Sequence, residues 1–579
     1  MTVEADRARS RSAAPESHPP HALPGEHPAL VGEASVSVDC STGVGPMSRM
    51  WTSFGYDEIN WTYTPTGKQT LTKIGGFGDR PYHVRPHYVF CSGTGFGLPH
   101  WGNGNVYHED ADGNPSYDFA IADQVYDAIV GAGHHPLVEL AFTPLDLVPE
   151  EAKREFPFEN SPTAYSGYEA GWWSYPPKDY ARWGELVAAL ATHCLERYGA
   201  QEVSQWLWEL WNEPDIFYWR GTPEQFYELY DVTSRAIRQV LPEARVGGPT
   251  VTGGSRGVPF LRGFLAHCAE SGAALDFVSF HTKGSAFRPW RVYGPLGAPA
   301  PERQSPSTLK MLREVRRLLD VVGEFPQYAD LPCVVDECDA SVPAHWGVYD
   351  NANFGYRNTE YYAVFQAKLM KKLHDLNAVS PAQVSHATTW SFYFEGERYF
   401  EGTRALVTTS GIDKPVLNAY RMFARLGDER LAATSSASWP LSALDDAGTG
   451  MAEEVDVLAT RDDDGQVSVL VWRHVDDQYA TAEGPTAVTV RLENVPADVA
   501  GFDVDHWRID HDHSNAHTVW QGLGAPQGPT PEQVAAIRER AGLERHESPR
   551  RVTVAGARVE LSTDLPLPSV SLFVLTPVR

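Results

Sequence analysis

Residues 206–215 read Trp-Leu-Trp-Glu-Leu-Trp-Asn-Glu-Pro-Asp and decide the fold. The stretch is rich in Trp and Leu, which predicts a buried barrel strand, and Pro214 ends it because proline has no N–H to donate to a ladder. Strand side chains alternate between faces, so Glu209 and Glu213 are expected on one face and Asn212 on the other. Asn212 and Glu213 then stand at the carboxyl end of a strand, where (β/α)8 barrels carry their catalytic groups.

Outward from this stretch, apolar strand-like runs alternate with helical patterns from residue 36 to about residue 430, which is typical of βα units. The expected strands reach the count of a (β/α)8 barrel. They are Trp51–Tyr56, Val84–Phe90, Pro136–Phe142, Ser204–Glu213, Ala244–Pro249, Phe277–His281, Cys333–Asp339 and Ala387–Phe394. The sequence therefore predicts an α/β fold in which residues 36–430 form a catalytic TIM barrel.

The two ends of the chain follow other patterns. Residues 1–35 are rich in Ala, Arg, Ser, His and Pro, which predicts a disordered or loosely tethered tail. Residues 431–579 show short alternating runs between Asp- and Gly-rich turns, which indicates a C-terminal antiparallel β-sandwich as an accessory domain. A helix over Pro531–Ala541 interrupts it. A strand near residues 34–40 is a candidate to pair with this sandwich, which would make the domains non-contiguous.

Composition limits the partners. The chain carries 48 Lys plus Arg against 75 Asp plus Glu, a formal charge of -27. Such an acidic surface repels nucleic acid and anionic membranes, so we expect neither as a partner. The six cysteines include no C-x-x-C pair and are expected to be reduced core residues. The first thirty residues lack the apolar core of a signal peptide, so we expect a cytoplasmic protein. A homo-oligomer is compatible with the sequence.

A second buried run, residues 332–339, also ends in acids. In a regular strand one of Asp336 and Glu337 points outward and the other inward. If this run is the seventh barrel strand and the run before Glu213 is the fourth, two carboxylates converge across the barrel mouth. Glycoside hydrolysis requires such a pair: one protonates the departing oxygen, and the other attacks the anomeric carbon or activates water. The alternative is that these acids are structural and pair with a barrel arginine or pack beside tryptophans.

Further motifs follow one another along the chain. They are Val84-Arg85-Pro86-His87, Val138-Glu139-Leu140-Ala141-Phe142-Thr143-Pro144, Glu209-Leu210-Trp211-Asn212-Glu213-Pro214, Val246-Gly247-Gly248-Pro249, Asp276-Phe277-Val278-Ser279-Phe280-His281 and Gly411-Ile412-Asp413-Lys414-Pro415. In this order, from about residue 47 to the C-terminus, the chain resembles glycoside hydrolase family 39, the family of β-xylosidases and α-L-iduronidases.

The resemblance implies roles for single residues. Glu213 would be the general acid/base and Glu337 the nucleophile of a double displacement, since the family is retaining. Asn212 would hydrogen-bond the sugar 2-hydroxyl. His281, at the end of the sixth strand, would help to position the nucleophile or the sugar. The two carboxyl groups should then stand about 5 to 5.5 Å apart.

The resemblance also implies the surroundings of these groups. His87 and Trp390 would line the same pocket. No cofactor and no metal is expected, and the substrate would be an oligosaccharide or another glycoside. A non-catalytic sugar-binding barrel is the alternative from a different functional class. The presence of both Glu213 and Glu337 argues against it, because loss of either would have favoured it.

Two cations bear on the identity of the sugar. Lys283 stands where the xylosidases usually carry a tyrosine and is similar to the iduronidase branch, where a lysine reaches the substrate carboxylate. Arg404 stands about where iduronidases use an arginine for the same group. Two such cations suit a uronate, or they neutralise acids of the site itself, namely Glu337, Glu395 and Glu397. The expected activity is that of a β-xylosidase-like exo-glycosidase, with α-L-iduronidase-like or α-L-arabinosidase activity as alternatives.

Two other features have no place in this assignment. The loop over residues 284–306 is rich in Pro, Gly and Arg and is placed to overhang the site as a lid. The run Asp510-His511-Asp512-His513 with His517 offers metal ligands. Its spacing fits no standard zinc pattern, so a structural role is favoured.

Overall fold

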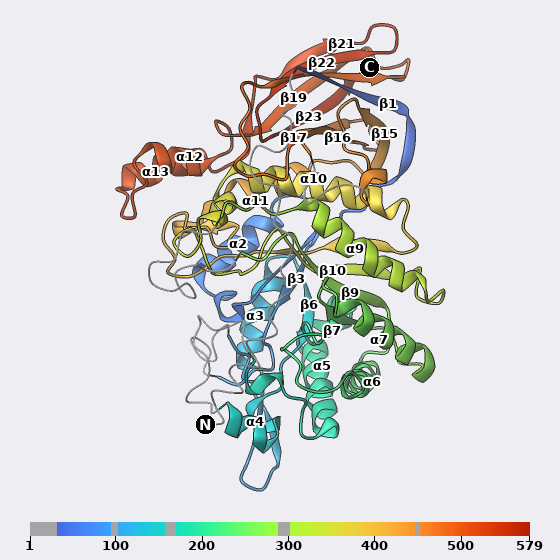
Figure 1. The fold of residues 1–579 in the computed structure, drawn as a ribbon, viewed down its shortest axis with the longest axis vertical. Coiled ribbons are helices and arrows are strands. Elements are labelled where there is room, and N and C mark those ends of the chain that lie inside the picture. Colours follow the sequence, from blue (N-terminus) through green and yellow to red (C-terminus); the bar gives the residue numbers. More distant parts are fainter. Residues whose placement is uncertain (1–31, 94–101, 157–169, 288–301, 446–451) are drawn as a thin grey trace.

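The structure is a computed structural model that describes residues 32–93, 102–156, 170–287, 302–445 and 452–579. A parallel barrel sheet forms the lower body of the molecule in Figure 1, and a second sheet lies above it, with helix α10 (Glu360–Asn377) between them. Of the predicted tail, residues 1–31 lie outside the described residues. The same holds for residues 288–301 of the loop expected to act as a lid.

The first sheet closes into the predicted barrel. Its eighth strand is broken at Thr388 into β11, which pairs with β10, and β12, which pairs with β2. All its pairings are parallel. In chain order the strands are β2 (Ser53–Tyr56), β3 (His83–Pro86), β6 (His135–Leu140), β7 (Leu207–Leu210), β8 (Arg245–Val251), β9 (Phe277–Lys283), β10 (Pro332–Asp339), β11 (Gln383–Ala387) and β12 (Thr389–Trp390).

Amphipathic helices cover the outer face of the barrel. The longer ones are α2 (Pro65–Gly75), α3 (Ala120–Gly131), α5 (Tyr180–Val203), α6 (Pro223–Val240), α7 (Gly257–Ser271), α9 (Thr308–Gly323), α10 and α11 (Pro415–Phe423), and a short α4 (Glu150–Glu155) precedes α5. In α9, for example, Leu312, Val315 and Leu319 recur at helical spacing and are fully buried. Small hairpins lie beside the barrel, formed by β4 (Tyr107–Glu109) with β5 (Pro115–Tyr117) and by β13 (Val407–Thr408) with β14 (Ile412–Asp413).

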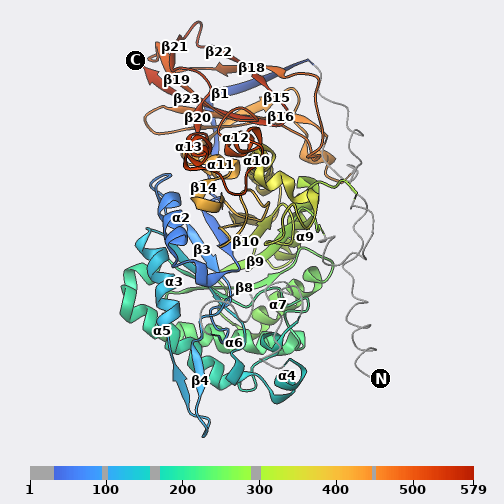
Figure 2. The same ribbon diagram turned by 90° about the vertical axis from the view of Figure 1, so that its left-hand side faces the viewer.

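The second sheet contains strands from both ends of the described chain. β1 (Glu33–Pro46) lies between β15 (Glu429–Ser435) and β18 (Thr486–Glu493), and Figure 2 shows it as a blue strand among orange and red ones. The other strands are β16 (Glu454–Arg461), β17 (Val467–His474), β19 (Gly501–Ile509), β20 (Glu544–Arg545), β21 (Arg550–Thr553), β22 (Val559–Leu565) and β23 (Ser569–Val578). Most of β1 thus falls inside the residue range 36–430 drawn for the barrel, yet it belongs to this sheet.

One pairing departs from the predicted antiparallel sandwich. β1 pairs antiparallel with β15 but parallel with β18, so the sheet is mixed. No hairpin joins β1 to either neighbour, so the antiparallel direction that short connections impose does not apply to it. The layered packing is otherwise that of a sandwich. Val36 of β1, Phe502 of β19 and Leu561 of β22 share one apolar core, because the sheet folds back on itself.

Buried ion pairs join the two parts of the molecule through α10. Lys368 lies 3.1 Å from Asp476, and Lys372 lies 2.9 Å from Glu454 and 2.8 Å from Asp456. Helices α12 (Ala516–Gly522) and α13 (Pro531–Glu539) project sideways from the second sheet domain (Figure 1), and α13 is the helix predicted there.

Two further observations concern the chain as a whole. The six cysteines are buried and none forms a disulfide, as expected for reduced core residues. Within the described ranges, no helix combines the length and the apolar character needed to cross a membrane.

Candidate active site

Glu213 reaches the barrel mouth because the backbone turns sharply after β7. The strand ends at Leu210, three residues earlier than predicted. Trp211 and Glu213 have φ angles of 69° and 47°, in the left-handed region that side chains rarely adopt. The alternation of faces expected as far as Glu213 is therefore wrong beyond Leu210. The N–H of Glu213 donates to the carbonyl of Thr250 at 3.1 Å, which holds the turn against the carboxyl end of β8.

The second acidic run is also irregular. The register between β9 and β10 shifts between Val335 and Glu337, so β10 carries a bulge at Asp336. Both Asp336 and Glu337 are buried and both contact the same side chain, Arg85, at 3.3 and 3.5 Å. The expectation that one of the two acids points outward is therefore wrong. A bulge places two successive side chains on one side of a strand.

The carboxylates of Glu213 and Glu337 face each other with His281 beside them. One carboxylate oxygen of each glutamate and one ring nitrogen of the histidine all lie within 4.8 Å of one another. Nδ1 of His281 lies 2.9 Å from Glu213 and 3.7 Å from Glu337, and its Nε2 lies 3.4 Å from Asp336. Their spacing alone would also suit a metal ion, but Nδ1 of His281 is within hydrogen-bond distance of Glu213, so we assign them as catalytic groups and not as metal ligands. The ammonium of Lys283 already contacts Glu337 there.

Arg85, at the centre of the barrel, was not singled out from the sequence. Its guanidinium is fully buried and lies 3.0 Å from Glu139, 2.7 Å from Glu209 and 3.2 Å from the side-chain oxygen of Asn212, in addition to its contacts with Asp336 and Glu337. Burial would lower the pKa of Arg85, but these acids outweigh burial and raise it. Burial and the charge of Asp336 raise the pKa of Glu209 to about 8, which removes one negative charge from the cluster at neutral pH.

His87 connects this cluster to the pocket wall. Its Nε2 lies 3.0 Å from Glu139 and 3.2 Å from Glu337, and its ring centre lies 4.4 Å from that of Trp390. The indole N–H of Trp390 donates to Asp57 at 3.3 Å. Burial would lower the pKa of His87, but Glu139 and the hydrogen bonds to both glutamates raise it to about 9. These acids thus favour the protonated ring, while the guanidinium of Arg85, 2.8 Å from the same Nε2, opposes it.

The charge on Glu337 is strongly favoured. Burial would raise its pKa, but the charges of His281 and Lys283 hold the pKa well below its usual range. In return Glu337 and Asp336 raise the pKa of His281 to about 10 against the effect of burial. Glu337 is thus a carboxylate at neutral pH and His281 an imidazolium.

The two cations weighed for substrate recognition both contact an acid that the sequence analysis did not assign to the site. Lys283 contacts Glu337 and Asp339, and Arg404 contacts the same oxygen of Asp339. Arg404 also lies 4.0 Å from Asp57. Their acidic partners are therefore Glu337, Asp339 and Asp57. The feature of the sequence that could have identified Asp339 is its place at the end of a buried strand.

All of the residues predicted for the site lie in this one network. They are Asn212, Glu213, His87, His281, Lys283, Glu337, Trp390 and Arg404. The acids Glu395 and Glu397, proposed as partners of the cations, bond elsewhere, since Glu397 accepts from Thr403 at 2.5 Å and Glu395 interacts with Tyr393.

The histidine-rich run lies outside this network, in the second sheet domain after β19. One oxygen of Asp510 accepts hydrogen bonds from the N–H groups of Asp512 and His513 and lies 2.9 Å from the His513 ring. His517 instead stacks on Trp520. Among the described residues this run forms no group with metal-binding spacing. It builds a tight turn.

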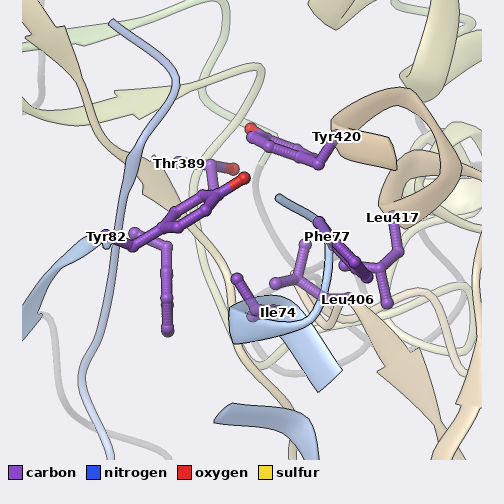
Figure 3. A pocket seen from close by; sticks show the side chains of 8 residues that line it. Ile74, Phe77, Tyr82, Thr389, Leu406, Leu417 and Tyr420 are labelled. Carbon is purple, nitrogen blue, oxygen red and sulfur yellow. The ribbon is translucent and has the colours of Figure 1, made fainter. Parts of the chain in front are cut away.

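A small cavity lies beside α2 and α11 (Figure 3). Its walls are Phe54, Ile74, Phe77, Tyr82, Thr389, Leu406, Leu417 and Tyr420. In Figure 3 the hydroxyl groups of Tyr82, Thr389 and Tyr420 lie toward one another, and the exposed lining of the cavity is apolar. It contains no carboxylate and no cation, so it offers no acid/base chemistry.

The chain is similar to known glycosidases over most of its length. Residues 61–558 match the family model described as glycosyl hydrolases family 39. The chain is 27% identical to a β-xylosidase of Geobacillus stearothermophilus over 447 residues, 75% of this chain and 76% of the relative. It is 30% identical to an α-L-iduronidase of Canis lupus familiaris over 420 residues, 67% and 59% of the two chains. A monomeric β-xylosidase from Caulobacter crescentus CB15 shares the fold, with a TM-score of 0.73 at 22% identity, over 94% of this chain and 100% of that one.

Proposed function

Because the chain belongs to glycoside hydrolase family 39, we propose that it is a retaining exo-glycosidase that removes a terminal β-xylosyl unit from an oligosaccharide or another glycoside. The spacing of Glu213 and Glu337 supports the reaction class. One oxygen of each lies within 4.8 Å of the other, in keeping with the short carboxyl separation of about 5 to 5.5 Å that retaining enzymes use.

The charges of the site support a division of labour between the two glutamates. Glu337, kept ionised by His281 and Lys283, attacks the anomeric carbon, and the bond from this carbon to the departing oxygen breaks. Glu213 gives its proton to that oxygen. In the second step Glu213 takes a proton from water, the water oxygen bonds to the anomeric carbon, and Glu337 leaves as a carboxylate. Asn212, held by Arg85 at 3.2 Å, is placed to bind a sugar hydroxyl.

The ion pairs of Lys283 and Arg404 support a neutral sugar. Both cations already contact Asp339, and Lys283 also contacts Glu337. A pentose without a carboxylate fits a pocket whose cations are already neutralised by its own acids. The similarity to β-xylosidases points the same way.

A uronide is the second candidate, because one observation favours it. Lys283 keeps about a sixth of its side chain exposed, 16%, beside the nucleophile, and Arg404 reaches the same oxygen of Asp339. A substrate carboxylate in this place would meet two cations at once. An α-L-arabinoside remains the third alternative from the sequence.

The decisive experiment is hydrolysis of a panel of aryl glycosides by the wild type, Lys283→Ala and Arg404→Ala. The panel contains the β-xyloside, the α-L-arabinofuranoside, the α-L-arabinopyranoside and the α-L-iduronide. We expect turnover of the β-xyloside. Turnover of the iduronide alone, lost in both variants, would overturn the proposal in favour of a uronidase. Lys178→Ala, which removes an exposed lysine paired with Glu109, is the control and should match the wild type.

A further inference from the structure

The peptide groups on both sides of Lys283 are held by a charged pair on α9. One carboxylate oxygen of Glu314 accepts hydrogen bonds from the hydroxyl of Thr282 at 2.9 Å and from the N–H of Lys283 at 3.2 Å. The ammonium of Lys310 donates to the carbonyl of Lys283 and to the other oxygen of Glu314. Lys283 is thus fixed at its N–H and at its carbonyl by one turn of a helix outside the barrel.

The chain leaves room for this contact. Glu314 is buried, 5% exposed, although it stands on the apolar face by which α9 packs on the barrel. A side chain at Gly253 would place its first carbon 2.7 Å from Glu314 and 3.0 Å from the carbonyl oxygen of His281. A buried carboxylate is costly unless it is paired and hydrogen-bonded. Glu314 therefore holds its position through these contacts, and Lys283 with it.

The start of α9 is held by the second sheet domain. Asp476, fully buried just after β17, accepts from the hydroxyl of Thr308 at 2.7 Å, the hydroxyl of Ser307 at 3.2 Å and the N–H of Leu309 at 3.3 Å. A carboxylate at a helix N-terminus binds free N–H groups and is favoured by the helix dipole. The position of α9 along the barrel is therefore fixed from the other domain.

We propose that Glu314 is a positioning residue for the reaction: with Lys310 it holds Lys283 on the nucleophile Glu337, and Asp476 of the second sheet domain anchors the helix that carries them. The proposal rests on the role proposed for Glu337. Other charged groups also face Glu337, from β3 and the residue after it, from the segments after β2 and β7, and from β9 and β10. They are Arg85, His87, Asp57, Glu213, His281 and Asp336. Glu314 and Lys310 act on Glu337 through Lys283 alone.

The test is the pH profile of kcat/KM, because a merely structural role would lower activity without moving its acid limb. In Glu314→Ala, Lys283 is released from Glu337, the pKa of Glu337 rises, and the acid limb should move up by about 1 pH unit with about a tenfold loss at the optimum. Glu314→Gln keeps one acceptor for the N–H of Lys283 and should shift the limb less. An unmoved limb in a folded Glu314→Ala protein overturns the proposal.

Two further variants keep the test decisive if Glu314→Ala fails to fold. Lys310→Met removes the donor to the Lys283 carbonyl and to Glu314 and should move the limb in the same direction. Asp476→Asn tests whether Asp476 anchors the start of α9. An acid limb that stays in place, at an unchanged melting temperature, would show that Asp476 has no part in positioning Lys283. Asp445→Asn is the matched control, since Asp445 pairs with Arg316 of α9 at the surface, and it should leave the profile unchanged. Retained activity in Glu337→Ala would instead refute the proposed nucleophile.

Discussion

Nδ1 of His281 lies 2.9 Å from a carboxylate oxygen of Glu213, while the same ring is held by Asp336 on its other side. As an imidazolium with both ring nitrogens protonated, His281 donates to Glu213 and places a positive charge next to Glu337. One ring thereby orients the proposed acid/base and favours the charge of the proposed nucleophile.

His281→Asn should lower kcat/KM by about 10² to 10³, because the variant loses both the orientation of Glu213 and the cation beside Glu337. The acid limb of the pH profile should also move upward, since the pKa of Glu337 is held down first by His281. Steady-state kinetics between pH 4 and pH 8 measures both. A reduced rate with an unmoved limb would mean that the histidine only packs.

Replacement of each glutamate should affect a different step. Glu337→Ala should lose activity by a factor on the order of 10⁴ or more, and added azide should restore turnover with an inverted product, since azide attacks from the vacated face. Chiral analysis of the glycosyl azide checks the stereochemistry.

Glu213→Ala should slow substrates with poor leaving groups by about 10² to 10⁴, while aryl glycosides with acidic phenols are largely spared, since they need no proton. A series of aryl leaving groups measures the slope of rate against leaving-group pKa. Equal losses across the series would rule out Glu213 as the proton donor.

Arg85→Met should destabilise the protein by about 3 to 5 kcal/mol, because it leaves Glu139 and Asp336 buried without their cation and Glu209 without its hydrogen-bond donor. Chemical denaturation followed by fluorescence measures the change in the free energy of unfolding. Arg197→Met is the matched control. It removes an exposed pair with Asp127 and should cost about 1 kcal/mol or less.

Stability should fall in alkali before ordinary lysines titrate. The folded-state pKa values of His87 and His281 are raised from 6.5 to about 9 and about 10. Their contribution is fully present below pH 6.5 and is lost as the pH rises through these folded-state values. Melting temperatures between pH 6.5 and pH 10 should therefore decline, and less steeply in His87→Gln. A melting temperature that stays constant over this range would contradict the protonation states assigned here.

Much of the site could be predicted because strand ends in a parallel barrel meet at one edge. This rule brought Glu213 and Glu337 together from runs more than a hundred residues apart. It failed where the backbone stops being regular. A strand is recognised in the sequence by side chains that alternate between its two faces. This alternation does not reveal the left-handed backbone at Trp211 and Glu213 or the bulge at Asp336.

The ion network was also beyond prediction for a physical reason. Glu139 and Glu209 each interrupt an apolar strand, which indicates a buried charge and hence a buried partner. Arg85 stands in a motif quoted for the family resemblance, but only the three-dimensional arrangement shows that one guanidinium serves both acids. The same holds for Asp339, whose two cations come from β9 and from a loop after β12.

The placement of β1 ties the earliest described strand to the latest part of the chain. Val38 pairs with Ala433 on one side and with Leu492 on the other, so a ribosome must add roughly 400 residues, over about 20 to 80 s, before these partners emerge. The barrel can therefore form before β1 has a partner strand from the second sheet. Cutting the chain at Met47 to express the barrel alone removes β1, which is an interior strand of the second sheet. One cut in the chain therefore cannot separate the two domains intact.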